Sequence, residues 1–351
     1  RELGQAFSRT VSSRQQPKIL NYAHDFLGHI DLRKEIVKYL EESRGVKVAL
    51  DNVMLTRGSL MAFTSIFQVL LKPGDKVAVG KVSFKVANHI IRIAQGQLVE
   101  VPVDQFGIDV DALERVCQES KICAVFVMPH HHHPTTVSLS AERRMKLLLL
   151  AKKYRFAIVE DDYDYDYHYA NSPILPMASS DRAGVVMYIG SLSKTVAPGL
   201  RIGFIVASKN VIKELSRLSR FLDCHGNMPL ERAIAMLFQE GEIRRHLKKS
   251  LKVYHERRDH FCALLLDQLG DYVEFKRPEG GLAAWVKFAP EIDINAIRIR
   301  AMSKGLQIPK SVFSDSNGNN LNAIRMGFAS LNKDEMRKAI GVLREVITPI
   351  S

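Results

Sequence analysis

Residues 188–204 read YIGSLSKTVAPGLRIGF, and this stretch says most about the fold. The apolar run at 185–189 predicts a strand, so Lys194 follows the C-terminal end of a strand, where open α/β sheets bind their ligands. Its small neighbours allow the lysine to be enclosed and to lose its proton, and only a neutral amine attacks an aldehyde. The alternative is an exposed lysine in a surface loop.

Polar side chains around Lys194 suit a phosphate dianion. Ser191 and Ser193 offer hydroxyl groups, and Arg201 offers a guanidinium that donates paired hydrogen bonds. Together these residues predict a site for a phosphorylated aldehyde.

A second apolar strand runs directly into carboxylates, in the stretch AIVEDDYDYDYHY at 157–169. A carboxylate at such a position keeps a pyridine nitrogen protonated, and a nearby tyrosine bonds a ring oxygen. An acidic loop or a site for Mg²⁺ or Ca²⁺ is the alternative. Tyrosines are poor ligands for these cations, and no GxxxxGK[ST] phosphate loop accompanies them.

Outward from these stretches, short apolar strands alternate with helices. Strands are expected at 76–79, 98–103, 122–128, 156–160, 185–189 and 202–207, and helices at 59–71, 84–95, 109–119 and 140–154. This alternation predicts an α/β fold with a mostly parallel central sheet covered on both faces.

The pattern changes after residue 209. Helices are expected through 209–268, then strands at 282–288 and 321–328 with helices at 293–304 and 333–346. These elements predict a smaller α+β domain, with which the N-terminal helix at 32–43 is expected to pack. We therefore predict a large domain at 46–255 and a small domain formed by 1–45 and 256–351.

Composition places the chain among soluble globular proteins. It has 351 residues, 25% of them charged, and a net charge of +12, which suits anionic ligands or is simply a solvated surface. No apolar run is long enough to span a membrane.

The four cysteines have no CxxC spacing, so reduced thiols in a cytoplasmic protein are expected. The polar run 314–320 is expected to be mobile.

The two stretches together resemble fold-type I enzymes that use pyridoxal 5′-phosphate (PLP), the aspartate aminotransferase superfamily. The resemblance is strongest to the aminotransferase-like domain of MocR-type regulators in the GntR family, which commonly read EDDYDSEFRY and GTFSKTLAPGLRLGY. Here the corresponding words are EDDYDYDYHY at 160–169 and GSLSKTVAPGLRIGF at 190–204. Shorter matches at 28–46, 245–258, 278–281 and 324–328 extend the resemblance over nearly the whole chain.

The resemblance implies a role for each matching residue. Lys194 would hold PLP as a Schiff base, the internal aldimine, and move the substrate's α-proton in an enzyme. The remaining assignments are Asp161 to the pyridine nitrogen, Tyr163 to the ring O3′, Ser191, Ser193, Arg201 and the helix start Gly58-Ser59-Leu60 to the phosphate, Phe84 to the ring face, and Arg325 to an amino acid's α-carboxylate. Phe84 as plain core, Ser59 as an N-cap and Arg325 as a structural ion-pair residue are the alternatives.

The chain departs from the superfamily at one motif. Asn-Pro-x-Gly is usual where this chain has His133-Pro134-Thr135-Thr136, so His133 would replace the asparagine beside the ring oxygen. This change puts efficient transamination in doubt. The run His130–His133 also suggests a metal, but successive residues of an extended chain point to opposite faces, so no metal site is predicted.

The sequence is compatible with three functions. The first is an effector-sensing domain of a GntR/MocR-type transcriptional regulator, which would reach DNA only through a winged-helix domain absent from these residues. The second is a free-standing PLP-dependent aminotransferase acting on an amino acid and a 2-oxo acid. The third is a structural or metal-binding protein without PLP. The resemblance also implies a homodimer that takes an amino acid or amine, and no membrane partner is expected.

Overall fold

The computed structural model describes residues 1–12, 19–22, 25–169, 173–223, 226–309, 313 and 321–347. The run 314–320 and Cys224 lie outside the described residues. Within these ranges, none of the helices combines the length and apolar content needed to cross a bilayer.

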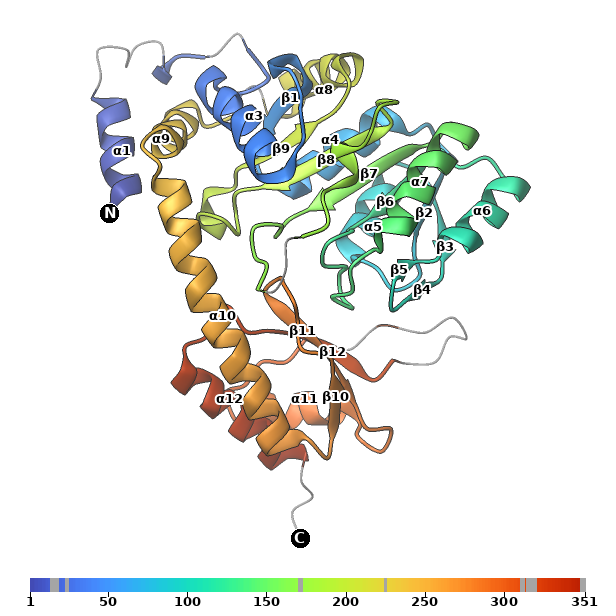
Figure 1. Ribbon diagram of the computed structural model, residues 1–351, viewed down its shortest axis with the longest axis vertical. Helices are drawn as coiled ribbons and strands as arrows, with labels where there is room; N and C mark the ends of the chain where they lie inside the picture. Colours follow the sequence, from blue (N-terminus) through green and yellow to red (C-terminus); the bar gives the residue numbers. More distant parts are fainter. Residues whose placement is uncertain are drawn as a thin grey trace.

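A seven-stranded sheet forms the centre of the larger part of the molecule (Figure 1). Its strand order is β1-β9-β8-β7-β6-β2-β3, and only β9 runs antiparallel to its neighbours. Its strands are β1 (Val53–Thr56), β2 (Lys76–Gly80), β3 (Gln97–Val101), β6 (Ala124–Val127), β7 (Ala157–Asp162), β8 (Val186–Ser191) and β9 (Gly203–Val206). The predicted α/β class with a mostly parallel sheet is therefore confirmed.

Helices cover both faces of this sheet, as its apolar strands require. They are α4 (Ser59–Leu70), α5 (Lys85–Ile93), α6 (Val110–Glu119), α7 (Ala141–Tyr154), α8 (Lys209–Leu222) and α9 (Met228–Gln239). Along β7, Ile158 joins one buried apolar cluster and the next residue, Val159, joins the other. This alternation is the period of two of a strand that is buried on both faces.

Two helices near the N-terminus pack on the large sheet's side of the molecule. Helices α1 (Glu2–Val11) and α3 (Ile30–Arg44) both contact α9, and α3 also contacts β1. Leu32, Ile36 and Leu40 belong to the same buried cluster as the sheet residue Ile158. The structure thus contradicts the expected packing of this helix with the C-terminal elements. An amphipathic stripe identifies the face that is buried but not the partner that buries it.

The C-terminal elements form a separate apolar core around an antiparallel sheet, β10-β11-β12. These elements are α10 (Glu242–Leu269), β10 (Val273–Phe275), β11 (Ala283–Phe288), α11 (Ile294–Ser303), β12 (Ala323–Gly327) and α12 (Lys333–Ile347). Figure 1 shows α10 running from the side of the large sheet down to α12. The domain boundaries themselves stay a prediction.

Short elements complete the described ranges. They are the hairpin β4 (Val103–Asp104) and β5 (Gly107–Ile108), and the 3₁₀ turns η1 (Leu50–Asn52), η2 (Met177–Ser179) and η3 (Pro198–Leu200). The turn η3 lies in the connection from β8 to β9, directly after the Lys194 turn. It ends at Arg201, whose backbone adopts the left-handed conformation with φ of 51°.

Candidate functional site

The predicted site residues gather at the carboxyl ends of parallel strands. Asp161 is the next-to-last residue of β7, Ser191 ends β8, and Gly58 follows β1. Phe84 follows β2, and the histidine run follows β6. Because these strands are parallel, their carboxyl ends meet at one edge of the sheet, the edge at which open α/β folds bind ligands.

Asp161 is a buried carboxylic acid. Its side chain is 3% exposed, and its Oδ1 has no hydrogen-bond partner in the described part of the chain. Burial, followed by the nearby Asp162 and Asp164, raises the pKa of Asp161 well above its ordinary value. The negative form of this carboxylate therefore needs a cationic N–H beside it, which a protonated pyridine supplies.

Tyr163 and Arg325 meet although they come from different parts of the chain. The Tyr163 hydroxyl donates to the backbone carbonyl of His131 at 2.9 Å, and Arg325 Nη2 donates to the Tyr163 hydroxyl at 3.4 Å. Arg325 lies on β12 opposite Trp285 of β11. Within the described residues no carboxylate stands at ion-pair distance from Arg325, and its Nε is buried without a hydrogen-bond partner there.

Gly58, Arg201 and Gly203 form a close-packed corner at the start of α4. Gly58 is the N-cap of α4 with φ of 77°, and a Cβ there would lie 2.6 Å from Nη2 of Arg201. A Cβ on Gly203 would lie 2.9 Å from the backbone carbon of Gly58. The lack of side chains thus brings the Arg201 guanidinium to a helix N-terminus, which is an anion-binding arrangement.

The remaining residues of that corner take distinct positions. Ser59 is the first residue of α4 rather than its N-cap, which is Gly58, and Leu60 is 41% exposed. The Ser191 hydroxyl accepts a hydrogen bond from the backbone N–H of Ser193 at 3.2 Å. The Ser193 hydroxyl is buried without a partner in the described part of the chain.

Lys194 itself is exposed in the single chain, between buried Ser193 and buried Thr195. Enclosure of the lysine by its small neighbours was expected, and this chain alone does not provide it. The neighbouring side chains are short, so they do not extend far enough to cover the long lysine side chain. Its backbone carbonyl accepts a hydrogen bond from the hydroxyl of Tyr167 at 2.7 Å.

Phe84 and His133 lie against each other at the site. Their ring centroids are 5.1 Å apart in an edge-to-face arrangement, and Phe84 also packs on Phe63. Burial, aided by Arg325 and His132, lowers the pKa of His133 to about 3. His133 is therefore a neutral imidazole at neutral pH, able to donate one hydrogen bond and to accept another.

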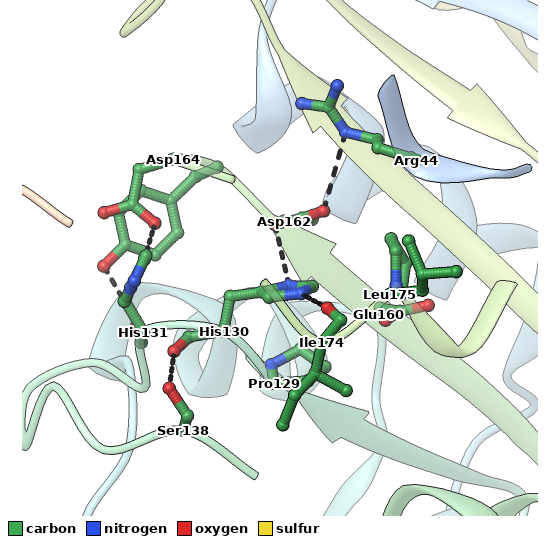
Figure 2. A network of polar contacts seen from close by, with 12 residues as sticks. Arg44, Pro129, His130, His131, Ser138, Glu160, Asp162, Asp164, Ile174 and Leu175 are labelled. Carbon is green, nitrogen blue, oxygen red and sulfur yellow. Dashed lines mark hydrogen bonds and ion pairs between the residues drawn. The ribbon is translucent and has the colours of Figure 1, made fainter. Parts of the chain in front are cut away.

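The four successive histidines go to different partners. His130 Nδ1 lies 3.1 Å from Oδ1 of Asp162, and its Nε2 lies 2.5 Å from the carbonyl of Ile174 (Figure 2). His131 Nδ1 lies 2.7 Å from Asp164, and His132 Nδ1 lies 2.7 Å from the Thr135 hydroxyl. The described residues contain no group of three metal-ligating side chains that could hold an ion. The run serves several local contacts instead.

A buried charge network beneath Asp161 was not foreseen from the sequence. Arg44, at the end of α3, lies 3.8 Å from Asp162 and 3.2 Å from Asp166 (Figure 2 shows the contact with Asp162). The hydroxyl of Tyr188 donates to Asp162 at 2.7 Å. Burial favours the neutral form of Asp162, but His130, Arg44 and Tyr188 outweigh it and hold the pKa of this carboxyl below its ordinary value. Arg44 lies too far from this segment in sequence for any local pattern to pair them.

These observations fit a phosphorylated pyridine aldehyde. Asp161 offers an unpartnered buried carboxylate oxygen, Ser193 offers an unpartnered hydroxyl, and the Gly58–Arg201 corner brings a guanidinium to a helix N-terminus. Lys194 offers a primary amine in the turn between them. The residues present therefore suit PLP in type and in placement.

Comparison with known proteins agrees with this site. The profile of the family described as "Aminotransferase class I and II" matches residues 4–343. Aromatic-amino-acid aminotransferase 1 of Thermococcus litoralis is 30% identical over 91% of this chain and 78% of its own length. The probable rhizopine catabolism regulatory protein MocR of Rhizobium meliloti is 26% identical over 97% of this chain and 69% of its own length.

Solved structures show the same fold. The kynurenine aminotransferase of Pyrococcus horikoshii, solved in complex with PMP, is 28% identical and superimposes with a TM-score of 0.89 over 99% of this chain and 86% of its own. The regulators and the enzymes among the relatives thus share one domain. With the family profile covering almost the whole chain, this protein belongs to the aminotransferase class I and II family, within the fold-type I PLP proteins.

Proposed function

We propose that this chain is the effector-sensing domain of a MocR-type transcriptional regulator, in which PLP and an amino compound are the ligands. PLP is the cofactor of the family, and the residues present fit it. The observation that carries the proposal is the buried Asp161 carboxylate, whose free Oδ1 lies in the same strand-end site as Lys194 and the Gly58–Arg201 corner.

Each residue has a defined task toward the cofactor. Asp161 would keep the proton on the pyridine nitrogen, and Lys194 would supply the amine that bonds the cofactor's aldehyde. Arg201, Ser191, Ser193 and the α4 N-terminus would hold the phosphate. When bound, PLP supplies an electron sink for the amino compound's α-carbon.

The amino compound would meet Arg325 and Tyr163. Arg325 carries a charge without a carboxylate partner in the described residues, so it suits an α-carboxylate. The Tyr163 hydroxyl is held by Arg325 on one side and by His131 on the other, and it would face the ring oxygen. Phe84 would face the ring, and the neutral His133 in contact with it would lie beside the ring oxygen.

The regulatory role is supported by the departures from Asn-Pro-x-Gly. His133 is larger than asparagine, and Thr136 takes the glycine position with a left-handed φ of 59°. The similarity to MocR over 97% of the chain agrees with this role. Such a regulator would act in the cytoplasm and contact DNA through a winged-helix domain, and ligand binding would shift its conformational equilibrium.

A titration with PLP tests the cofactor site. We expect a lysine-dependent absorbance that borohydride fixes on Lys194 and that Lys194→Ala abolishes. Lys209→Ala, at an exposed lysine on α8 paired with Asp51, is the control and leaves the absorbance unchanged. Fixation of the cofactor on other lysines in the wild type would refute the assignment.

A second candidate is a free-standing aminotransferase, and the 30% identity to the Thermococcus litoralis enzyme favours it. The two functions differ in turnover. Under the regulatory proposal, an amino acid changes the spectrum of the PLP form, with Arg325→Gln weakening this response, but multiple turnovers with a 2-oxo acid do not follow. Sustained production of a new amino acid would establish the enzyme instead.

We also propose a homodimer, because fold-type I aminotransferases are typically dimeric. A partner chain would then supply the enclosure of Lys194 that the single chain lacks. Sedimentation at micromolar concentration tests this proposal, and a monomer that binds PLP fully would contradict it.

A further inference from the structure

We infer that Tyr167 and Asp166 are positioning residues for Lys194, holding the backbone of its turn from the segment that follows β7. This inference rests on the proposed function of Lys194 as the residue that binds PLP. It concerns residues outside the set expected to touch the cofactor.

Two side-chain hydrogen bonds connect the Lys194 turn to the segment that follows β7. The hydroxyl of Tyr167 donates to the backbone carbonyl of Lys194 at 2.7 Å. The hydroxyl of Thr195 donates to Oδ2 of Asp166 at 3.0 Å. The two bonds stand on consecutive residues, so they hold both ends of the peptide that joins Lys194 to Thr195.

Tyr167 is held in place by burial, ring packing and backbone hydrogen bonds. Its side chain is 1% exposed, and its ring lies 5.2 Å from the ring of Tyr254 on α10. Its backbone carbonyl accepts a hydrogen bond from Gly281 at 2.7 Å, and its N–H donates to the carbonyl of Asp164 at 3.1 Å. A side chain held at both ends loses little further entropy when it bonds the Lys194 carbonyl.

Asp166 is fixed just as firmly. Arg44 lies 3.2 Å from its Oδ1, and the Tyr39 hydroxyl bonds the same oxygen. Oδ2 remains for Thr195, whose side chain is buried. The acceptor of the second bond is therefore anchored to α3.

These anchors matter because they act on the Lys194–Thr195 peptide itself, whereas the bonds from Leu192 and Val196 N–H hold the turn on either side of it. The Lys194 side chain is exposed, and its four-carbon stem is flexible, so the place of its amine depends on its backbone. Asp161 and Tyr167 lie on one continuous segment, six residues apart. The Tyr167 bond thereby fixes the lysine backbone relative to the carboxylate proposed to hold the pyridine nitrogen.

The test compares Tyr167→Phe with Tyr165→Phe in the full chain. Both variants remove one phenolic hydroxyl from the same segment, but the Tyr165 hydroxyl is buried with no hydrogen-bond partner in the described residues. Hydrogen exchange of the amides at 192–197, without added PLP, should be about tenfold faster in Tyr167→Phe, since one hydrogen bond contributes roughly that factor. The amides of β8 should exchange as in wild type.

PLP binding supplies a second measurement. Tyr167→Phe should weaken PLP about tenfold and shift the pKa of the lysine-bound chromophore, with Tyr165→Phe near wild type. Thr195→Val should act in the same direction, and Thr195→Ser, which keeps the hydroxyl, should restore binding.

The outcomes separate the two proposals. Equal exchange at 192–197 in both tyrosine variants would overturn the positioning role, as would equal PLP affinity and chromophore pKa. Absence of a Lys194 adduct in the wild type would instead overturn the proposed function, while the exchange difference would still report the tether.

Discussion

Arg44→Met is expected to destabilise the protein far more than the loss of an ordinary ion pair. Arg44 is 3% exposed and lies 3.2 Å from Asp166 and 3.8 Å from Asp162 (Figure 2). Its guanidinium carbon is 4.7 Å from the ring centre of Tyr39 and 4.5 Å from that of Tyr165. Methionine keeps the apolar stem and some of the ring contact but removes the charge.

The magnitude follows from the carboxylates left behind. Breaking a buried ion pair from one side costs about 3–5 kcal/mol, because the other charge stays buried without compensation. Asp162 keeps His130 and Tyr188. Asp166 keeps only hydroxyl donors among the contacts described, so it accounts for most of the loss. We expect the free energy of unfolding to fall by about 3–5 kcal/mol.

Urea unfolding followed by circular dichroism measures this loss. The control is Arg9→Met, which removes an exposed ion pair with Glu240 and should change stability little, because solvent screens an exposed pair. Arg44→Lys keeps the charge and should fall between the two. A loss for Arg44→Met no larger than that of Arg9→Met would show that the buried network contributes no more than a surface pair.

Three further changes have defined outcomes. Gly58→Ala should weaken PLP or inorganic phosphate binding in a titration by tenfold or more, because the new Cβ would lie 2.6 Å from Nη2 of Arg201 at a φ of 77°; unchanged affinity would argue against the anion corner. Thr136→Gly should raise the free energy of unfolding by about 1 kcal/mol, and with it the urea midpoint, since a β-branched residue there has a φ of 59°. An unchanged midpoint would show that Thr136 is not strained. Burial lowers the pKa of His132 to about 4. The unfolded chain takes up this proton from about pH 6.5 downward and the folded chain only near pH 4, so the stability present at neutral pH is lost as pH falls through this window. Between pH 7 and pH 5 the free energy of unfolding of His132→Gln should fall by about 2 kcal/mol less than that of the wild type. If the two proteins lost equal stability over this range, the lowered pKa of His132 would be contradicted.

Much of the fold follows from the sequence because its signals are local. The strand patterns before Asp161 and before Lys194 predict β7 and β8, and the structure places both at the centre of the sheet. The expected helical region 209–268 divides into α8, α9 and α10, and α10 begins after Gly241, whose φ is 72°. Element bounds differ from expectation by only a few residues, since periodicity decays gradually at an end.

The sequence by itself determined the strand-and-helix pattern, the placement of Lys194 and Asp161 at strand ends, and the family. These properties depend on neighbouring residues, which share backbone geometry. Only the tertiary structure decided that Arg325 reaches Tyr163 across 162 positions, that Arg44 supports Asp162 and Asp166, and that α3 packs on α9 rather than on the C-terminal core. An apolar stripe or a charge specifies the kind of partner it needs, but packing of the whole chain selects which partner it meets.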